Sequence, residues 1–297
     1  MSMPPVEPFS LSVIICTRDR APQLEQCLQK FKEAQTFRKS WELVVVDNNS
    51  SDDTKAVILK FAESAPFHVR YLFEGQRGLS HARNRGIAET SGSIIAFTDD
   101  DCLVDRQWAS TIVCEFSTDR SLAVLGGRVE PGDPNGKTGT RTFSDRKQIT
   151  SFEELLSRMI GCNMAFSRKV FEVIGGFDPL LGKGTSLPAE DIDLLYRALR
   201  GQLKIVHVPE AVVVHAHGRA SASSIQQVND EYAKGRGGFY WKHAVRGDLR
   251  IAKHAVREIV HLIRASLVSG SRHEARPSPP RVLRNLAMGA FYRLMGR

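Results

Sequence analysis

The sequence lacks the features that mark membrane-spanning, secreted and zinc-binding proteins. No apolar run reaches the ~18 residues of a spanning helix. The first ten residues, MSMPPVEPFS, contain neither a basic region nor an apolar core, so we expect no secretory signal. The cysteines are odd in number, scattered and without a CxxC pair, which argues against a disulfide framework or a zinc site; they are Cys16, Cys27, Cys102, Cys114 and Cys162.

Most of the chain also carries no net positive charge. The net charge is +8, but residues 241–297 hold 12 Lys or Arg against 3 Asp or Glu. The first 240 residues therefore carry a net charge of −1. A nucleic-acid-binding fold spreads its basic residues over a face of the domain and interleaves aromatic side chains. Neither pattern is present, so we expect no nucleic-acid partner.

Strand and helix patterns alternate over the first hundred residues. Apolar runs predict strands at 11–16, 41–47, 68–73 and 93–98, and helical spacing predicts helices at 21–34, 54–63 and 78–90. This alternation is typical of a parallel sheet with helices on both faces. After residue 120 we expect a strand at 122–131, a strand and short helix within 161–184, a helix at 189–201 and two short strands within 204–218. From about residue 225 the pattern is helical.

Polar residues follow three of the predicted strands, where ligands of such sheets bind. These strand ends read Thr17-Arg18-Asp19, Asp47-Asn48-Asn49 and Asp99-Asp100-Asp101, and no GxGxxG motif follows the first strand. Alternate residues of a strand face the same way, so Asp99 and Asp101 are expected to reach one point while Asp100 turns elsewhere. Two carboxylates at one point need a cation such as Mg²⁺ or Mn²⁺. The alternative is a solvated turn.

Three further groups have both structural and functional interpretations. Asp47 is suited either to accept hydrogen bonds from a base or ribose or to close an ordinary turn. Glu190, Asp191 and Asp193 lie at the start of a predicted helix, where acidic side chains interact favourably with the helix dipole. The functional alternative is that one of them acts as a general base. His215 and His217 lie on the same side of a strand, and one of them would complete a metal site.

The ordered set of motifs resembles family 2 glycosyltransferases with the GT-A fold. The matching segments span roughly residues 10 to 220 and are LSVIICTRDR, ELVVVDNNSSDDT, GLSHARNRGIAETSGSIIAFTDDDCLVDRQW, GCNMAFSRKVFEVIGGFDPLLGKG, AEDIDLLYRALRG and VHVPEAVVVHAHG. The resemblance implies an α/β fold with a Rossmann-like mixed sheet flanked by helices. It also implies an inverting, metal-dependent glycosyltransferase of the hexosyltransferase type. Such an enzyme uses a nucleotide-diphospho-sugar donor.

The resemblance implies a role for each matched residue. The nucleobase would lie against Asp47, Thr17 and Arg18, and Arg77, Gly78 and Arg83 would face the nucleotide. Asp99 or Asp100 would contact the ribose. Asp101, together with His215 or His217, would bind the metal ion, Mn²⁺ or Mg²⁺. Asp191, with Glu190 as the second choice, would take the proton of the acceptor hydroxyl in a single inverting displacement. Gly161, Asn163 and the loop Leu181–Leu187 would border the acceptor, and this Gly-rich loop would also close over the donor sugar.

The resemblance and the charge pattern together predict a catalytic domain and a basic extension. We expect a GT-A domain at 1–225, with a nucleotide-binding half at about 10–120 and an acceptor half at about 121–225, followed by amphipathic helices at 226–297. The stripe Leu249, Ala252, Val256, Ile259, Ile263 and Leu267 would pack on the catalytic domain, or residues 245–297 would lie on an anionic membrane.

Function and location follow from the same resemblance. The acceptor would be a glycan or a lipid-linked hydroxyl in cell-surface polysaccharide or glycolipid synthesis. We expect the protein in the cytoplasm, free or bound peripherally to the inner face of the membrane. One alternative is a sugar-phosphate nucleotidylyltransferase, which would have a Gly-rich basic loop where this chain has TRDRAPQ. The other is a non-catalytic nucleotide-sugar-binding relative, which would lack the acids Asp47, Asp101 and Asp191 that are present here.

Overall fold

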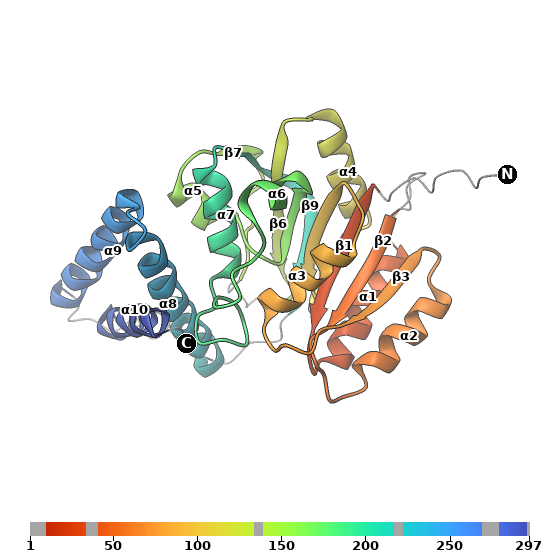
Figure 1. Cartoon of the computed structure of the whole chain (residues 1–297), viewed down its shortest axis with the longest axis horizontal. Coiled ribbons are helices and arrows are strands. Elements are labelled where there is room, and N and C mark those ends of the chain that lie inside the picture. Colours follow the sequence, from red (N-terminus) through yellow and green to blue (C-terminus); the bar gives the residue numbers. More distant parts are fainter. Residues whose placement is uncertain (1–9, 34–40, 134–138, 217–221, 269–278, 296–297) are drawn as a thin grey trace. The chain divides into compact units, whose positions relative to one another are not determined.

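The computed structural model describes residues 10–33, 41–133, 139–216, 222–268 and 279–295. It divides into two compact units, each drawn in Figure 1. The first contains residues up to Arg77, His81–Gly176 and Leu194–Gly218, and the second contains Gly78–Ser80, Phe177–Asp193 and the chain from Arg219 onward. The second unit thus combines an internal segment, 177–193, with the C-terminal helices. The domain boundary expected at residue 225 stays a prediction.

The first unit is built on one mixed sheet in the order β3-β2-β1-β4-β8-β6-β9-β5, with β7 pairing β9. The four strands β1 to β4 pair in parallel, β8 runs antiparallel to β4 and β6, and β6 is parallel to β9. The strands are β1 (Leu11–Thr17), β2 (Trp41–Asp47), β3 (His68–Phe73), β4 (Ile94–Asp99), β5 (Cys102–Val104), β6 (Leu122–Pro131), β7 (Lys147–Ile149), β8 (Asn163–Ser167) and β9 (Lys204–His215). The mixed α/β fold predicted from the sequence is confirmed.

Helices cover both faces of this sheet, as the buried apolar runs predict. The main core packs α1, α2 and α4 against one face, with Phe31, Ile58 and Trp108 in contact with alternate strand residues. Phe97 and Phe166 point to the other face and pack on Phe171 of α6. The helices assigned mainly to this unit are α1 (Ala21–Glu33), α2 (Thr54–Ser64), α3 (Leu79–Glu89), α4 (Trp108–Thr118), α5 (Phe152–Arg158), α6 (Lys169–Ile174) and α7 (Glu190–Arg200).

The prediction of two short strands within 204–218 was wrong, because residues 204–215 form the single strand β9. Its pairing with β6 breaks between Val208 and Val212 and resumes with a shifted register. Pro209 lies in this gap, where the absence of an amide hydrogen disturbs the ladder least. The irregularity that suggests a strand end in the sequence is accommodated here as a bulge.

The second unit contains three long helices, α8 (Ala222–Ala244), α9 (Leu249–Val268) and α10 (Pro279–Leu294). They pack on one another and are drawn in blue in Figure 1. The helical character predicted after residue 225 is confirmed over these ranges. None of the helices in the described part of the chain combines the length and hydrophobicity needed to span a bilayer.

Candidate active site

The carboxyl ends of β1, β2 and β4 meet at one edge of the sheet. Thr17 pairs with Asp47 across β1 and β2, and Cys16 pairs with Asp99 across β1 and β4. The parallel register therefore brings the three polar strand ends together, as the sequence predicts. The loops that follow β1 and β2 are also joined, because Asp52 accepts a hydrogen bond from the Ala21 amide and Asp19 accepts one from Ser51.

Arg20 connects two of the three consecutive acids. Its guanidinium lies 3.1 Å from Asp100 Oδ1 and 2.7 Å from Asp101 Oδ2. Thr17 Oγ1 donates a hydrogen bond of 2.8 Å to Asp100 Oδ2. Both carboxylates are buried, so the cation offsets a repulsion that water screens little there. Arg20 was not among the site residues predicted from the sequence, although it belongs to the TRDR segment that follows β1.

Asp99 has a cationic partner of its own, Arg83. Arg83 Nη2 lies 3.3 Å from Asp99 Oδ1 and 3.5 Å from the Gly161 carbonyl oxygen. Asp99 and Asp101 therefore have different cationic partners, and their expected convergence on one point stays a prediction. Strand β4 ends at Asp99, and the chain turns at Asp100 and Asp101, so alternation along a strand does not apply to them. Asp99 keeps about a third of its side chain exposed, whereas Asp100 does not.

The buried position of Asp100 changes its acidity. Burial raises the pKa of this carboxyl to about 6; the charge of Arg20 opposes the shift and the charge of Asp101 adds to it. Asp101 behaves in the opposite way. Burial works to raise its pKa, but His215 and Arg20 hold it below the ordinary value of 3.8. Neighbouring carboxylates therefore have different environments.

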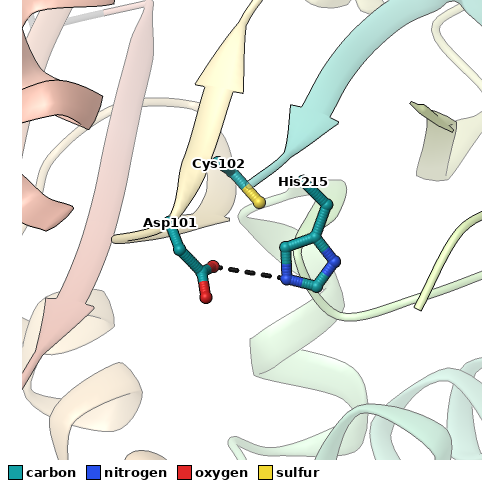
Figure 2. A group of neighbouring side chains, drawn as sticks. All are labelled: Asp101, Cys102 and His215. Carbon is teal, nitrogen blue, oxygen red and sulfur yellow. Dashed lines mark ion pairs between the residues drawn. The ribbon is translucent and has the colours of Figure 1, made fainter. Parts of the chain in front are cut away.

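Asp101 and His215 form a pair at the junction of β5 and β9 (Figure 2). His215 Nε2 lies 3.3 Å from Asp101 Oδ1, and His215 Nδ1 donates to the Gly139 carbonyl oxygen over 3.0 Å. That second bond fixes the ring with Nε2 directed at the carboxylate, which is the arrangement of metal-binding histidines. Burial works to lower the pKa of His215, but the Asp101 carboxylate raises it above its ordinary value of 6.5.

This pair fits a divalent cation. Asp101 Oδ1 is buried and accepts no hydrogen bond from the described residues. An oxygen and a nitrogen ligand directed at one point suit Mn²⁺. Cys102 lies close enough to be a third ligand. However, burial and Cys162 raise the pKa of its thiol well above 9.0, so the thiolate that a metal needs is disfavoured. His217 lies outside the described residues.

Asp47 is buried at the end of β2 with both carboxylate oxygens engaged. Oδ1 accepts from the Ser50 amide at 2.9 Å, and Oδ2 accepts from the Tyr71 hydroxyl at 3.1 Å. Burial, followed by the charge of Asp47, raises the pKa of Tyr71 to about 12. The tyrosine is therefore a neutral donor that holds the carboxylate in place. Its position on β3, opposite β2, was not singled out in the sequence.

The remaining predicted residues of the first unit lie in different surroundings. Arg18 is half-buried and pairs with Asp19, and Arg77 is exposed. Asn163 is 1% exposed. Its amide donates to the carbonyls of Arg128 and Ala211 and accepts from Trp108 Nε1. The Asn163 side chain therefore holds β6, β9 and α4 together.

The predicted catalytic acids lie in the second unit, as does Gly78. Glu190 and Asp191 form the first turn of α7, where Glu190 is buried and Asp191 is half-buried. Asp191 Oδ1 accepts a hydrogen bond from the Ile192 amide. Gly78 has a φ of +133°, a conformation that side chains avoid, and it packs close to Gly184. Residues 177–193 also hold the loop Leu181–Leu187.

The sequence matches a family model over residues 12–175, which is more than half of the chain. The model is that of glycosyl transferase family 2. The chain belongs to this family. The matched range includes the Arg20–Asp100–Asp101 group, and it ends before His215 and the acids of α7.

Relatives in other organisms agree with this assignment. Glycosyltransferase AglE of Haloferax volcanii is 34% identical over 174 residues, covering 57% of this chain and 56% of its own length. The GalNAc(5)-diNAcBac-PP-undecaprenol beta-1,3-glucosyltransferase of Campylobacter jejuni is 34% identical over 93 residues, covering 31% and 29%. The chain spans about half the length, or less, of these curated relatives.

Among solved structures, the fold is similar to a mannosyltransferase of Pyrobaculum calidifontis in complex with GDP-Man and Mn²⁺. The TM-score is 0.65 at 20% identity, over 98% of this chain and 88% of that one. S. aureus TarS in complex with UDP-GlcNAc gives 0.62 at 13% identity, over 97% and 93%. At these identities the likeness establishes the GT-A fold.

Proposed function

We propose that the protein is an inverting glycosyltransferase that moves a sugar from a nucleotide-diphospho-sugar to a hydroxyl group of a glycan or lipid-linked acceptor. The observation that carries this proposal is the group formed by Arg20, Asp100, Asp101 and His215 at the strand ends. Such a group in a family 2 chain suits the diphosphate and ribose of a donor. A nucleotidylyltransferase or a non-catalytic relative is not favoured by any contact described above.

On the donor side, Asp47, Thr17 and Arg18 would hold the base, and Arg77, Gly78 and Arg83 would face the nucleotide. Asp99 is the better candidate for the ribose, because part of its side chain is exposed whereas Asp100 is buried against Thr17 and Arg20. Asp100 would then act through Arg20, keeping the guanidinium aimed at the carboxylate next to it. The Gly161 carbonyl would border the acceptor.

Asp101 and His215 would hold the divalent cation, with Mn²⁺ favoured over Mg²⁺ by the imidazole nitrogen. A bound cation would stabilise the negative charge that develops on the departing diphosphate. His215 would bind the cation through an unprotonated Nε2, while Nδ1 keeps its proton and donates a hydrogen bond to the Gly139 carbonyl oxygen. The hydrogen bond from Arg20 to Asp101 Oδ2 fixes the carboxylate before any ligand arrives.

Asp191 would act as the general base, with Glu190 the second choice because it is more buried. The acceptor hydroxyl loses its proton to the Asp191 carboxylate as its oxygen forms a bond to the anomeric carbon. The bond from that carbon to the diphosphate oxygen breaks on the opposite face, so the configuration inverts. No covalent enzyme intermediate is needed.

We further propose that α9 binds an anionic membrane and so brings the enzyme to a lipid-linked acceptor. One face of α9 packs on α8 through Glu258, which contacts Tyr240 and Arg236, and the same face carries the buried Ile251. A second face exposes the apolar side chains of Leu249, Val256, Ile259, Val260 and Ile263. A third exposes Arg250, Lys253, Arg257 and Arg264. Adjacent apolar and basic faces are typical of helices that lie in a membrane interface.

Calorimetry with UDP, GDP and dTDP, each with and without Mn²⁺, tests the donor site directly. We expect one nucleotide to bind with an affinity that falls when the metal is removed by a chelator. Absence of metal-dependent binding to all three would refute the proposed donor site.

A further inference from the structure

The second unit contains a buried cluster of charged side chains that none of the proposed catalytic steps uses. Lys242 Nζ lies 2.8 Å from Asp178 Oδ2 and 2.6 Å from Asp193 Oδ1. His243 Nε2 lies 2.9 Å from the same oxygen of Asp193, and Arg293 Nη2 lies 2.6 Å from Asp178 Oδ2. The side chains of Asp193 and Lys242 are 0% and 4% exposed. Helices α8 and α10 thus supply cations to two acids from an internal segment.

The two acids stand at opposite ends of the segment 177–193. Asp178 begins it, and its carboxylate and carbonyl oxygens accept hydrogen bonds from the amides of Leu180 and Leu181. Asp193 ends it, two residues after Asp191 in the same first turn of α7. One ammonium group therefore ties both ends of the segment that contains the proposed base and the loop Leu181–Leu187.

The backbone of α8 also approaches this segment closely. A Cβ atom on Gly235 would lie 2.0 Å from the Pro188 carbonyl oxygen, and one on Gly238 would lie 2.9 Å from the Leu187 side chain. On another side of α8, a Cβ on Gly237 would lie 1.9 Å from the Leu286 carbonyl oxygen of α10. The glycines of the GRGG run let α8 lie directly against both the segment and α10.

A buried ion pair is a weak means of stabilising a fold, since desolvation offsets much of the attraction and apolar residues would serve as well. What such a cluster supplies is a defined geometry, because an ammonium held between two carboxylates tolerates little displacement. We propose that Lys242 is a positioning residue of the transferase reaction: it fixes the segment 177–193 so that Asp191 meets the acceptor hydroxyl. This inference rests on the proposed function, in which Asp191 is the base.

The test compares Lys242→Met with the matched control Glu258→Gln. The control breaks the contacts of Glu258 with Tyr240 and Arg236, which join α8 to α9 and do not involve 177–193. Turnover is the release of nucleoside diphosphate from UDP-glucose or GDP-mannose, whichever binds, with water as acceptor. We expect Lys242→Met to lower kcat about 10- to 100-fold with a much smaller change in the nucleotide Kd, because the base is displaced while Asp47, Arg20 and Asp101 of the donor site lie outside the segment. Glu258→Gln should keep its kcat.

Hydrogen exchange supplies a readout that needs no substrate. In Lys242→Met we expect faster amide exchange across 177–193 at temperatures well below the Tm, with the strands of the first unit unchanged. In Glu258→Gln the same segment should exchange as in the native protein. Unchanged exchange of 177–193 in Lys242→Met, or an unchanged kcat, would overturn the inference.

A double variant separates positioning from charge balance. Lys242→Met leaves two buried carboxylates with one fewer cation, and adding Asp178→Asn restores the balance without restoring the bridge. We expect the Tm of Lys242→Met/Asp178→Asn to recover while kcat stays low. Recovery of both would assign the cluster a purely structural role.

Two outcomes distinguish a wrong assignment of the base from a wrong assignment of Lys242. If Asp191→Asn keeps native turnover, the base is misassigned. If Asp191→Asn is inactive while Lys242→Met is fully active, the positioning inference alone is wrong.

Discussion

The guanidinium of Arg20 lies 2.7 Å from Asp101 Oδ2 and, through its other terminal nitrogen, 3.1 Å from Asp100 Oδ1. This one side chain allows two adjacent carboxylates to be buried at the end of β4. It also leaves the other oxygen of Asp101 directed at His215. Asp100 and Asp101 thus share Arg20, whereas Asp99 pairs with Arg83. Neighbouring acids are therefore suited to different roles in the site.

Removal of Arg20 should destabilise the fold. In Arg20→Gln, two buried carboxylates lose their shared cation, and we expect the free energy of unfolding to fall by about 2 kcal/mol in chemical denaturation. Arg18→Gln is the matched control, because Arg18 pairs only with its exposed neighbour Asp19 among the contacts described. Equal stability losses in the two variants would contradict the bridging role.

Loss of either proposed metal ligand should remove the metal dependence of donor binding. Asp101→Asn and His215→Ala each delete one of two protein ligands, so we expect Mn²⁺ to leave nucleotide affinity unchanged in calorimetry. His68→Ala, at the start of β3, serves as the control and should keep the full response to Mn²⁺. A normal response in His215→Ala would exclude His215 and direct attention to His217.

Substitution of the proposed base should separate binding from turnover. Asp191→Asn keeps the shape of the side chain but cannot accept the proton, so we expect kcat to fall by about 100-fold or more with the nucleotide Kd unchanged. Glu190→Gln, one residue earlier in the same turn, should have the smaller effect on kcat. The opposite ranking would reassign the base to Glu190.

Acid should weaken the second unit through Asp178. Burial works to raise the pKa of Asp178, but hydrogen bonds and charge from Lys242, with the Leu180 amide and Arg293, hold it below 3.8. Asp193 and His243 share the same cluster. A depressed pKa means that this stabilisation is present above the unfolded value and is lost as the pH falls through the folded value.

As the pH falls below the ordinary pKa value of 3.8, the native protein should therefore lose more unfolding free energy than Asp178→Asn. The measurement is urea denaturation across this range. Parallel curves for the two proteins would show that Asp178 contributes nothing to the acid sensitivity.

Membrane binding should depend on the apolar and basic faces of α9 separately. Replacing Ile259 and Ile263 by Ser should release the protein from vesicles that contain phosphatidylserine, whether anionic lipid is abundant or scarce. Replacing Arg250, Lys253 and Arg257 by Gln should weaken binding by about 1 kcal/mol for each residue, and only to anionic vesicles. Both effects are measured by co-sedimentation.

The control for these variants is Val173→Ser on α6, an apolar side chain of the first unit that is more exposed than Ile259 or Ile263. Binding that is unchanged when 245–297 is deleted would show that the basic helices do not contact the bilayer.

Much of the sheet was predictable because its strands are short, apolar and separated by clear turn residues. All seven residues of Trp41–Asp47 are buried, and the segment WELVVVD is recognisable in the sequence as one strand. Strands β5 and β7 were missed because each has only three residues and gains its pairing from β9. Such contacts depend on a distant partner, which local patterns do not contain.

The sequence predicted which residue types lie at the candidate site, but not which side chains contact one another there. The acids at strand ends were found because parallel strands present their carboxyl ends at one edge. Arg20 and Tyr71 were missed, since nothing in their local sequence says that one is to meet Asp101 and the other Asp47. Asn163 was assigned to the acceptor from its motif, but burial shows its amide engaged with β6, β9 and α4.

The alternation of strands and helices, the polar strand ends and the basic, amphipathic C-terminal helices were predictable, because each follows from residue order within one element. The choice of cation for each acid depends on folding: Arg20 pairs with Asp100 and Asp101, Arg83 with Asp99, and Lys242 with Asp178 and Asp193. These pairings join residues 16 to 81 positions apart. Their geometry exists only once the chain has folded and excluded water from the charges.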